Sequence, residues 1–339
     1  MVHYRAMTTG GELALATRAV RKSYGSRLAL DGLDLSVPTG VVYGFLGPNG
    51  AGKTTTMRLL TGLIHVDGGS IEMLGRPFGR GDRRRLFEVG ALVETPTFYP
   101  YLSGRENLRA LAAAGPKTPK NRVSEVLELV GLTERGGDKV SRYSLGMKQR
   151  LGIAGALLSD PKLLLLDEPA NGLDPAGIVA MRETLKHFAS TGKTVFVSSH
   201  LLAEVQQLAD VVGIIAKGKL VREGTMKDLL ATEGVVRVRV TPDEIPRAVE
   251  ILTAMTGPDQ VAVSTSEHGW LAVQIPQDRS SEMNRALSQA GIYASGLEAG
   301  NDLEELFLSL TRSEAGTDPD GMFAGRPPTP EGPTDWAGV

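Results

Sequence analysis

The residues best suited to chemistry form a glycine-rich loop at positions 47–55, which reads Gly-Pro-Asn-Gly-Ala-Gly-Lys-Thr-Thr. Glycines allow consecutive backbone N–H groups to turn toward one bound anion. The ammonium of Lys53 can contact the outer phosphates of a nucleoside triphosphate, and the Thr54 hydroxyl can ligate Mg²⁺. The loop residues that we expect to contact the nucleotide are Gly47, Pro48, Asn49, Gly50, Ala51, Gly52, Lys53, Thr54 and Thr55.

The segments on either side of this loop have the pattern that a phosphate-binding loop needs. Residues 41–46 are an apolar run that reads as a buried strand, and residues 57–60 read as the first turns of a helix. A strand, loop and helix in this order place the positive end of the helix dipole at the phosphates. The alternative, a structural loop without a nucleotide, is disfavoured by this context. The sequence therefore predicts binding of a nucleoside triphosphate.

A second candidate group lies where the apolar run 163–166 ends in Asp167 and Glu168. Two adjacent charges at the end of a buried strand are costly unless they are used. Asp167 can hold Mg²⁺ through water, and Glu168 can accept a proton from an attacking water molecule. The alternative is an acid pair that caps a following helix.

Two further polar residues border predicted elements. His200 follows the buried strand 194–198 after a single residue, Ser199. A lone histidine is usually structural, but the ends of strands in an alternating α/β sheet converge on the ligand. Ser144 precedes a predicted helix that runs to Leu158. Its hydroxyl can cap that helix or bind a phosphate oxygen, and spacing alone favours the cap.

The composition limits the class of protein. The 339 residues include 41% hydrophobic and 22% charged residues, a formal net charge of −2, and no cysteine. Disulfides and thiolate metal sites are excluded, and no overall field attracts nucleic acid, so we expect no nucleic-acid partner. No apolar run approaches the roughly 20 residues of a membrane-spanning helix. We therefore expect a cytosolic protein whose membrane role depends on a partner.

The chain divides into two predicted domains with terminal segments. Strands alternate with helices from 13 to 231, which predicts an α/β nucleotide-binding domain with a mainly parallel sheet. Residues 235–310 follow the order β-α-β-β-α-β, which predicts a small ferredoxin-like α+β domain. Its last elements are expected at 292–297, a strand, and 303–310, a helix. Residues 1–12 are expected to be flexible, and the Pro/Gly-rich tail 313–339 is expected to be disordered.

The phosphate loop, the segment 144–146, the Asp167–Glu168 pair and His200 occur in an order and spacing that resembles the ATP-binding-cassette (ABC) ATPases. The resemblance covers about residues 13–230. It implies a P-loop NTPase of the ABC type. Such a domain has a mostly parallel core sheet, an antiparallel β subdomain and a helical subdomain, here at about 95–160.

The resemblance implies roles for the residues that hold the nucleotide. The loop 47–55 matches the Walker A loop, and Asp167 matches the magnesium-binding acid. Glu168 matches the catalytic base, and His200 matches the switch histidine. Tyr24 matches the aromatic residue that stacks on adenine, an interaction of ~1–3 kcal/mol. The cofactors implied are ATP and Mg²⁺.

The resemblance also implies that two cassettes build each site. Ser144 and Gly146 match the signature motif, and Asp174 matches the D-loop. In this family two cassettes meet head to tail, so Ser144 would contact the γ-phosphate of the ATP held by Lys53 of the other cassette. The chain is expected to form a homodimer or to pair with a related cassette.

Two positions depart from the usual family pattern. The signature reads Tyr-Ser-Leu-Gly-Met at 143–147 instead of Leu-Ser-Gly-Gly-Gln, and Glu94 replaces the usual glutamine. A carboxylate can ligate Mg²⁺, but it cannot donate a hydrogen bond to the attacking water. Both variants resemble those of bacterial antibiotic-resistance exporters, which makes them features of a subgroup. The alternative for Glu94 is a surface glutamate without a role.

An aromatic cluster at Phe98, Tyr99 and Tyr101 is predicted to lie on a loop. Clustered exposed aromatic residues mark contact surfaces. By resemblance, this is the groove where a separate transmembrane permease docks, and the alternative is a local core under the loop. The expected location is the cytoplasmic face of the membrane, with peripheral attachment through the permease.

The leading hypothesis is thus an ATP-hydrolysing subunit that powers export of a drug, antibiotic or lipid-like substrate. A soluble ABC ATPase of translation or DNA repair is the alternative, but those proteins usually carry two cassettes, coiled coils or zinc insertions. A non-catalytic regulatory cassette is disfavoured by the intact Lys53, Asp167, Glu168 and His200. A P-loop kinase or GTPase would lack the signature segment.

Overall fold

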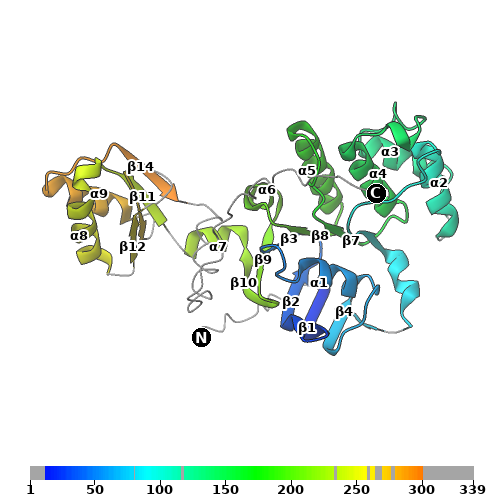
Figure 1. Cartoon of the computed structure of the whole chain (residues 1–339), viewed down its shortest axis with the longest axis horizontal. Helices are drawn as coiled ribbons and strands as arrows, with labels where there is room; N and C mark the ends of the chain where they lie inside the picture. Colours follow the sequence, from blue (N-terminus) through cyan, green and yellow to red (C-terminus); the bar gives the residue numbers. More distant parts are fainter. Residues whose placement is uncertain are drawn as a thin grey trace, which may run out of the picture.

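The structure is a computed structural model that describes residues 12–79, 81–115, 118–232, 235–257, 260–263, 269–275 and 279–300. Its described strands form three sheets. Figure 1 shows two of these sheets together with most of the helices, and the third sheet with two helices as a lobe of its own.

The central sheet is built from continuous apolar strands. It has six strands in the order β10-β9-β3-β8-β7-β6, parallel throughout except for β10 at one edge. Every residue of β3, β7, β8 and β9 is buried, because both faces of the sheet are covered. The strands are β3 (Val42–Leu46), β6 (Val89–Leu92), β7 (Leu163–Asp167), β8 (Thr194–Ser199), β9 (Val211–Ala216) and β10 (Lys219–Thr225).

An antiparallel sheet in the order β2-β1-β4-β5 covers one face of the central sheet together with α1 (Lys53–Leu60) (Figure 1). Buried side chains of all three elements form a single cluster, in which Met57 of α1 lies with Tyr43 and Phe196 of the central strands. The rings of Tyr43 and Phe196 stack with centroids 5.2 Å apart. The strands are β1 (Leu13–Tyr24), β2 (Arg27–Pro38), β4 (Gly68–Met73) and β5 (Arg76–Phe78).

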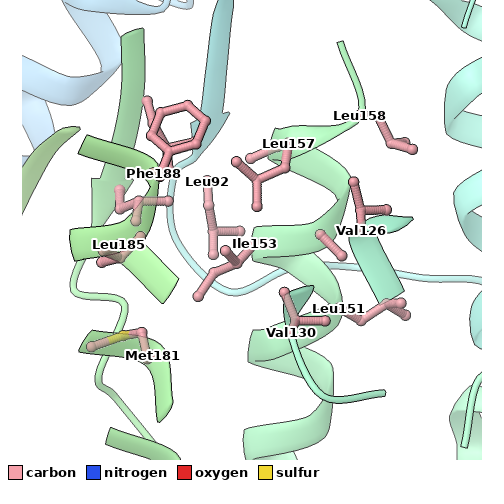
Figure 2. Packing of buried hydrophobic residues seen from close by; sticks show 14 of the residues in the cluster. Leu92, Val126, Val130, Leu151, Ile153, Leu157, Leu158, Met181, Leu185 and Phe188 are labelled. Carbon is pink, nitrogen blue, oxygen red and sulfur yellow. The ribbon is translucent and has the colours of Figure 1, made fainter. Parts of the chain in front are cut away.

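Helices cover the opposite face of the central sheet. Figure 2 shows Ile153 and Leu157 of α4 between Val126 of α3 and Leu185 of α5, all within one buried cluster. Because α4 is packed on several sides, it is apolar around most of its surface. The helices are α2 (Gly104–Ala114), α3 (Arg122–Leu129), α4 (Leu145–Leu157) and α5 (Pro175–Ser190).

Shorter helices complete this part of the chain. Side chains of α6 and α7 form a small buried cluster with Leu46, Val212 and Ile214 of the central sheet. Among the described residues, none of the helices has both the length and the apolar character needed to cross a bilayer. The short elements are η1 (Arg83–Glu88), η2 (Val140–Arg142), α6 (Leu202–Leu208), α7 (Met226–Thr232) and η3 (Pro242–Glu244).

The third sheet has the predicted ferredoxin-like arrangement. Its order is β12-β13-β11-β14, antiparallel throughout, so that the first strand of the unit lies inside the sheet. Buried residues of α8 and α9, such as Leu252 and Leu287, pack with Val236 and Val238 of β11. The elements are β11 (Val235–Arg239), α8 (Ile245–Thr256), β12 (Val261–Val263), β13 (Trp270–Gln274), α9 (Ser280–Gln289) and β14 (Gly296–Gly300).

The prediction of a strand at 292–297 is wrong about where the strand begins. Gly291 has φ 81°, and Ile292 N–H donates to the Leu287 carbonyl at 2.9 Å, which closes the end of α9. Ile292 is buried because a residue after such a left-handed helix end packs back on the helix. The strand therefore begins only at Gly296. The predicted helix 303–310, the tail 313–339 and residues 1–11 lie outside the described residues.

Candidate active site

The glycine-rich loop connects β3 to α1 at the middle of the central sheet. Gly52 is the residue before the helix and has φ 113°, where a Cβ would come within 2.9 Å of the Ala29 carbonyl oxygen. A Cβ on Gly47 would lie 2.5 Å from the Ile215 carbonyl oxygen. The tight backbone path of this loop therefore requires glycine at both positions.

Lys53 is the first residue of α1, and its side chain is only 6% exposed. Its ammonium donates to the carbonyl oxygens of Gly47 at 2.7 Å and Pro48 at 3.3 Å. The Glu168 carboxylate lies 3.3 Å from the same nitrogen. The buried charge is thus satisfied within the chain, as a buried ammonium must be.

Asp167 and Glu168 lie where β7 ends. Asp167 is buried, and the Ser198 hydroxyl of β8 donates to its Oδ1 at 2.5 Å. The backbone N–H of Glu168 donates to Ser198 Oγ at 3.1 Å and to the Ser198 carbonyl at 3.1 Å. Glu168 has φ 49°, a left-handed conformation that is uncommon outside glycine and often found at functional sites.

His200 joins the same group of residues. Its Nδ1 lies 2.8 Å from Glu168 Oε2, and its backbone N–H donates to that oxygen at 3.4 Å. Glu168 therefore bridges the ammonium of Lys53 and the imidazole of His200. Glu168 and His200 directly follow β7 and β8, and Lys53 follows β3 through the phosphate loop, so all three lie at the carboxyl edge of the central sheet. We call Lys53, Glu168 and His200 the strand-end cluster.

Tyr24 lies at the end of β1 with its ring 45% exposed. Lys22 approaches this ring at 5.8 Å and pairs with Asp67 at 2.7 Å. Hydrogen bonds from Lys22 and from the Ser23 N–H lower the pKa of Asp67. Arg27 lies three residues after Tyr24. A Cβ added to Gly50 of the loop would lie 3.4 Å from the Arg27 guanidinium. The turn after Tyr24 therefore borders the phosphate loop.

The signature residues make different contacts. Ser144 is the N-cap of α4, and its hydroxyl accepts from the Met147 N–H at 3.2 Å. A Cβ on Gly146 would meet the Leu173 side chain at 3.2 Å. Asp174 caps α5 by accepting from the Gly177 N–H at 3.0 Å. Within the described part of the chain, no hydrogen bond or ion pair links Ser144 to the strand-end cluster.

Glu94 lies two residues beyond β6, on the loop that leads to the helical side. Its carboxylate forms an ion pair with the Arg58 guanidinium of α1, and its side chain is 52% exposed. Glu94, which the sequence predicts as a Mg²⁺ ligand, therefore lies at the expected edge of the sheet, but its carboxylate forms an ion pair with an arginine.

The aromatic cluster was expected to be either a contact surface or a local core under the loop, and each hypothesis describes part of it. Phe98 is partly buried and packs against the large cluster beneath the helices. Tyr99 and Tyr101 are 57% and 65% exposed, and their ring centroids lie 5.8 Å apart. The local core accounts for Phe98, and the two tyrosines form an exposed aromatic pair.

Three residues at this site were not identified from the sequence: Ser198, Arg27 and Arg58. Ser198 had one usable signal, since a hydroxyl near the end of a buried strand has to find a partner. The strand register that places Ser198 beside Asp167 is a property of the folded sheet. Nothing in the local pattern marks Arg27 or Arg58, because exposed arginines are common.

Comparison with known proteins identifies the class. A family model described as "ABC transporter" matches residues 30–171. The bacitracin transport ATP-binding protein BcrA of Bacillus licheniformis is 50% identical over 210 residues, covering 62% of this chain and 69% of that protein. An uncharacterized ABC transporter ATP-binding protein, YhcH of Bacillus subtilis (strain 168), is 40% identical over 266 residues, covering 70% and 87%.

A solved structure described as the ATP-binding subunit of an ABC transporter is also similar. It is 30% identical, has a TM-score of 0.58, and covers 64% of this chain and 91% of that chain. The chain belongs to the ABC transporter family and is one of its ATP-binding, ATP-hydrolysing proteins. The predicted fold class is confirmed. The domain boundaries and the roles of individual site residues stay predictions.

Proposed function

We propose that this chain hydrolyses ATP to power export of an antibiotic, or of a related drug or lipid-like substrate, through a separate transmembrane permease. The observation that carries the catalytic part is the strand-end cluster, in which Glu168 bridges Lys53 and His200. The exporter part is supported by the 50% identity to a protein named for bacitracin transport. The two departures at Glu94 and in the signature segment also resemble exporters of that group.

The cluster can exchange partners when ATP enters. The γ-phosphate is an anion that competes with Glu168 for the Lys53 ammonium, because charge-assisted contacts to phosphate are strong. Glu168 then loses one cationic partner and can accept a proton from the attacking water. His200 keeps hold of Oε2 and orients the carboxylate. The backbone N–H groups of the loop and the start of α1 hold the other phosphates.

Magnesium fits the oxygen donors at this site. Thr54 follows Lys53 in the first turn of α1, and Asp167 uses one carboxylate oxygen for Ser198. Hydroxyl and carboxylate oxygens are ligands that Mg²⁺ prefers, and it usually keeps several waters as well. The ion would supply neutralisation of the charge on the β- and γ-phosphates. Ser198 would keep the acidic ligand in one orientation.

A second cassette, which we take to be another copy of this chain, would complete the site. Ser144 is exposed at the start of a 13-residue helix, and the neighbouring Leu145 is 54% exposed. A helix start with an exposed hydroxyl that can still donate its hydrogen can bind a phosphate from a second molecule. Tyr24 would stack on adenine, and the Tyr99–Tyr101 pair would contact the permease at the cytoplasmic face of the membrane.

The test uses Glu168→Gln, with Glu128→Gln as the matched control on the exposed side of α3. Loss of the general base should lower ATP turnover by about 10²- to 10⁴-fold while ATP binding persists. Cells that carry the chain with its permease should also lose protection against bacitracin with Glu168→Gln only. Full turnover by Glu168→Gln would refute the catalytic assignment, and unchanged susceptibility with a working permease would refute the antibiotic assignment.

A further inference from the structure

Glu94 and Glu168 occupy equivalent places on adjacent strands. Leu92 of β6 pairs with Leu166 of β7 in parallel register, and each glutamate lies two residues further along its strand. Both have left-handed backbones, with φ 64° and 49°. Neighbouring parallel strands are about 4.8 Å apart, so the chain places two glutamates at equivalent positions beyond the carboxyl ends of adjacent strands.

The two carboxylates have different cationic partners. Glu168 contacts the buried Lys53, whose ammonium is expected to bind phosphate. Glu94 pairs with Arg58, which lies one helical turn and a half further along the same helix α1. The helix that starts at the phosphate loop therefore provides one cation for each acid. Arg58 is the only basic residue in the last turn of this helix.

Arg58 also reaches the base side of the site. The ion pair with Glu94 is the largest cause that raises the pKa of Arg58, and the nearby Tyr24 acts in the same direction. The guanidinium is thus close both to the expected adenine contact and to the acid at the end of β6. A planar guanidinium can hold two such partners at once, which a lysine ammonium does less well.

The pair is poorly suited to a purely structural role. The side chains of Arg58 and Glu94 are 41% and 52% exposed, and exposed ion pairs contribute little to stability. A carboxylate at the rim of a site for a highly negative triphosphate is, in contrast, unfavourable unless a cation compensates it. The left-handed φ of Glu94 indicates that the backbone holds this acid in place despite some strain.

We propose that Arg58 is a positioning residue that neutralises Glu94 and holds it beside Tyr24, so that a glutamate at this position does not repel the incoming triphosphate. This inference rests on the proposed function, because it concerns the same nucleotide site. It predicts that the need for Arg58 disappears when Glu94 is made neutral.

The experiment measures the affinity of the full chain for a fluorescent ATP analogue with Mg²⁺ in five proteins: wild type, Arg58→Gln, Glu94→Gln, the double variant and Arg279→Gln. Arg279 pairs with Glu282 at 2.9 Å with similar exposures of 47% and 56%, so it is a matched control away from the site. Arg58→Gln should weaken binding about three- to tenfold. In the Glu94→Gln background, the same substitution of Arg58 should change binding by less than about twofold. Arg279→Gln should stay within about twofold of wild type.

The dependence of binding on salt is a second measurement, and it would not change if Arg58 had only a structural role. The loss caused by Arg58→Gln should shrink as ionic strength rises, because the repulsion from an exposed Glu94 is screened. Arg58→Lys keeps the charge but not the planar guanidinium, so it should recover most, but not all, of the binding that Arg58→Gln loses. Equal binding by Arg58→Gln and wild type, or a loss from Arg58→Gln that is as large in the Glu94→Gln background as in the wild type, would overturn the proposal. Absence of binding by wild type would instead refute the proposed function, and this inference with it.

Discussion

The strand-end cluster and the signature region use their polar residues in opposite ways. Lys53, Glu168 and His200 contact one another and satisfy their charges within one chain. Ser144 and Asp174 also have partners, but each caps its own helix, and Ser144 stays exposed. One half of the site is therefore pre-organised around the buried Lys53, and we call it the closed half. The other half, which we call the open half, is rigidly placed but exposed. Such an open half is suited to contact a nucleotide held by a second molecule.

The largest effect is expected from removing the cation of the closed half. Lys53→Ala removes the phosphate contact and leaves Glu168 without its ammonium partner in a partly buried site. ATP affinity, measured by calorimetry, should fall more than about 100-fold. Lys162→Ala is the control, since that lysine is 70% exposed and pairs with Glu88 on the surface. Unchanged ATP affinity in Lys53→Ala would show that this half of the site does not hold ATP through the ammonium of Lys53, and the contrast between the two halves would be wrong.

The rigidity of the closed half can be tested at Ser198. Ser198→Ala leaves buried Asp167 without its hydroxyl partner, which should cost about 1–3 kcal/mol in the free energy of unfolding. Denaturant unfolding measures this loss. Ser295→Ala, an exposed serine of the third sheet's lobe, should change stability by less than about 0.5 kcal/mol. Equal stability of Ser198→Ala and wild type would show that Asp167 is not held as tightly as the geometry indicates.

The open half is tested at Ser144, with Ser103 as a matched control. Both serines are helix N-caps that accept a backbone N–H, so alanine at either should cost about 1 kcal/mol of stability. Only Ser144→Ala should also lower ATP turnover, by about tenfold, because only Ser144 is expected to meet a phosphate. A similar loss of turnover in both variants would assign the effect of Ser144 to capping.

The smallest effect is expected from a carboxylate outside both halves. Glu223 accepts from Tyr43 at 2.6 Å and from the Ser36 N–H at 3.1 Å, and burial raises the pKa of its carboxyl above the ordinary 4.5. The folded state thus favours the protonated acid, so its stabilising effect is complete below pH 4.5 and is lost as pH rises through the raised pKa.

Glu223→Gln removes the charge and keeps an acceptor for Tyr43. It should therefore raise stability at pH 7 to 8 by up to about 1 kcal/mol and change little near pH 4. Thermal unfolding at the two pH values measures the difference, with turnover expected to be unchanged. A destabilised variant at pH 7 would indicate that the ionised form is favoured by the fold after all.

The sequence predicted the closed half well because its residues lie directly at the ends of apolar strands or inside a glycine-rich loop. The parallel sheet then brings Lys53, Glu168 and His200 together, as the strand–loop–helix pattern requires. The resemblance to ABC ATPases supplied Ser144, Asp174 and Tyr24, which local spacing alone left as caps or surface residues.

The remaining features depend on contacts that no local pattern encodes. Ser198 reaches Asp167 through the register of β7 and β8. Arg58 pairs with Glu94, which is 36 positions further along the sequence. The start of β14 was misplaced because Ile292 has the apolar character of a strand residue but closes the end of α9. In each case the contact that decides the structure forms only in the folded chain.

The central claim is that one copy holds ATP through Lys53 while another covers it with Ser144. The most direct test mixes Lys53→Ala chains with Ser144→Ala chains and measures ATP turnover. In a symmetric dimer, each mixed pair has one site with both residues intact, so turnover should recover to about a quarter of the wild-type value. Turnover that stays at the average of the two separate variants would contradict the account.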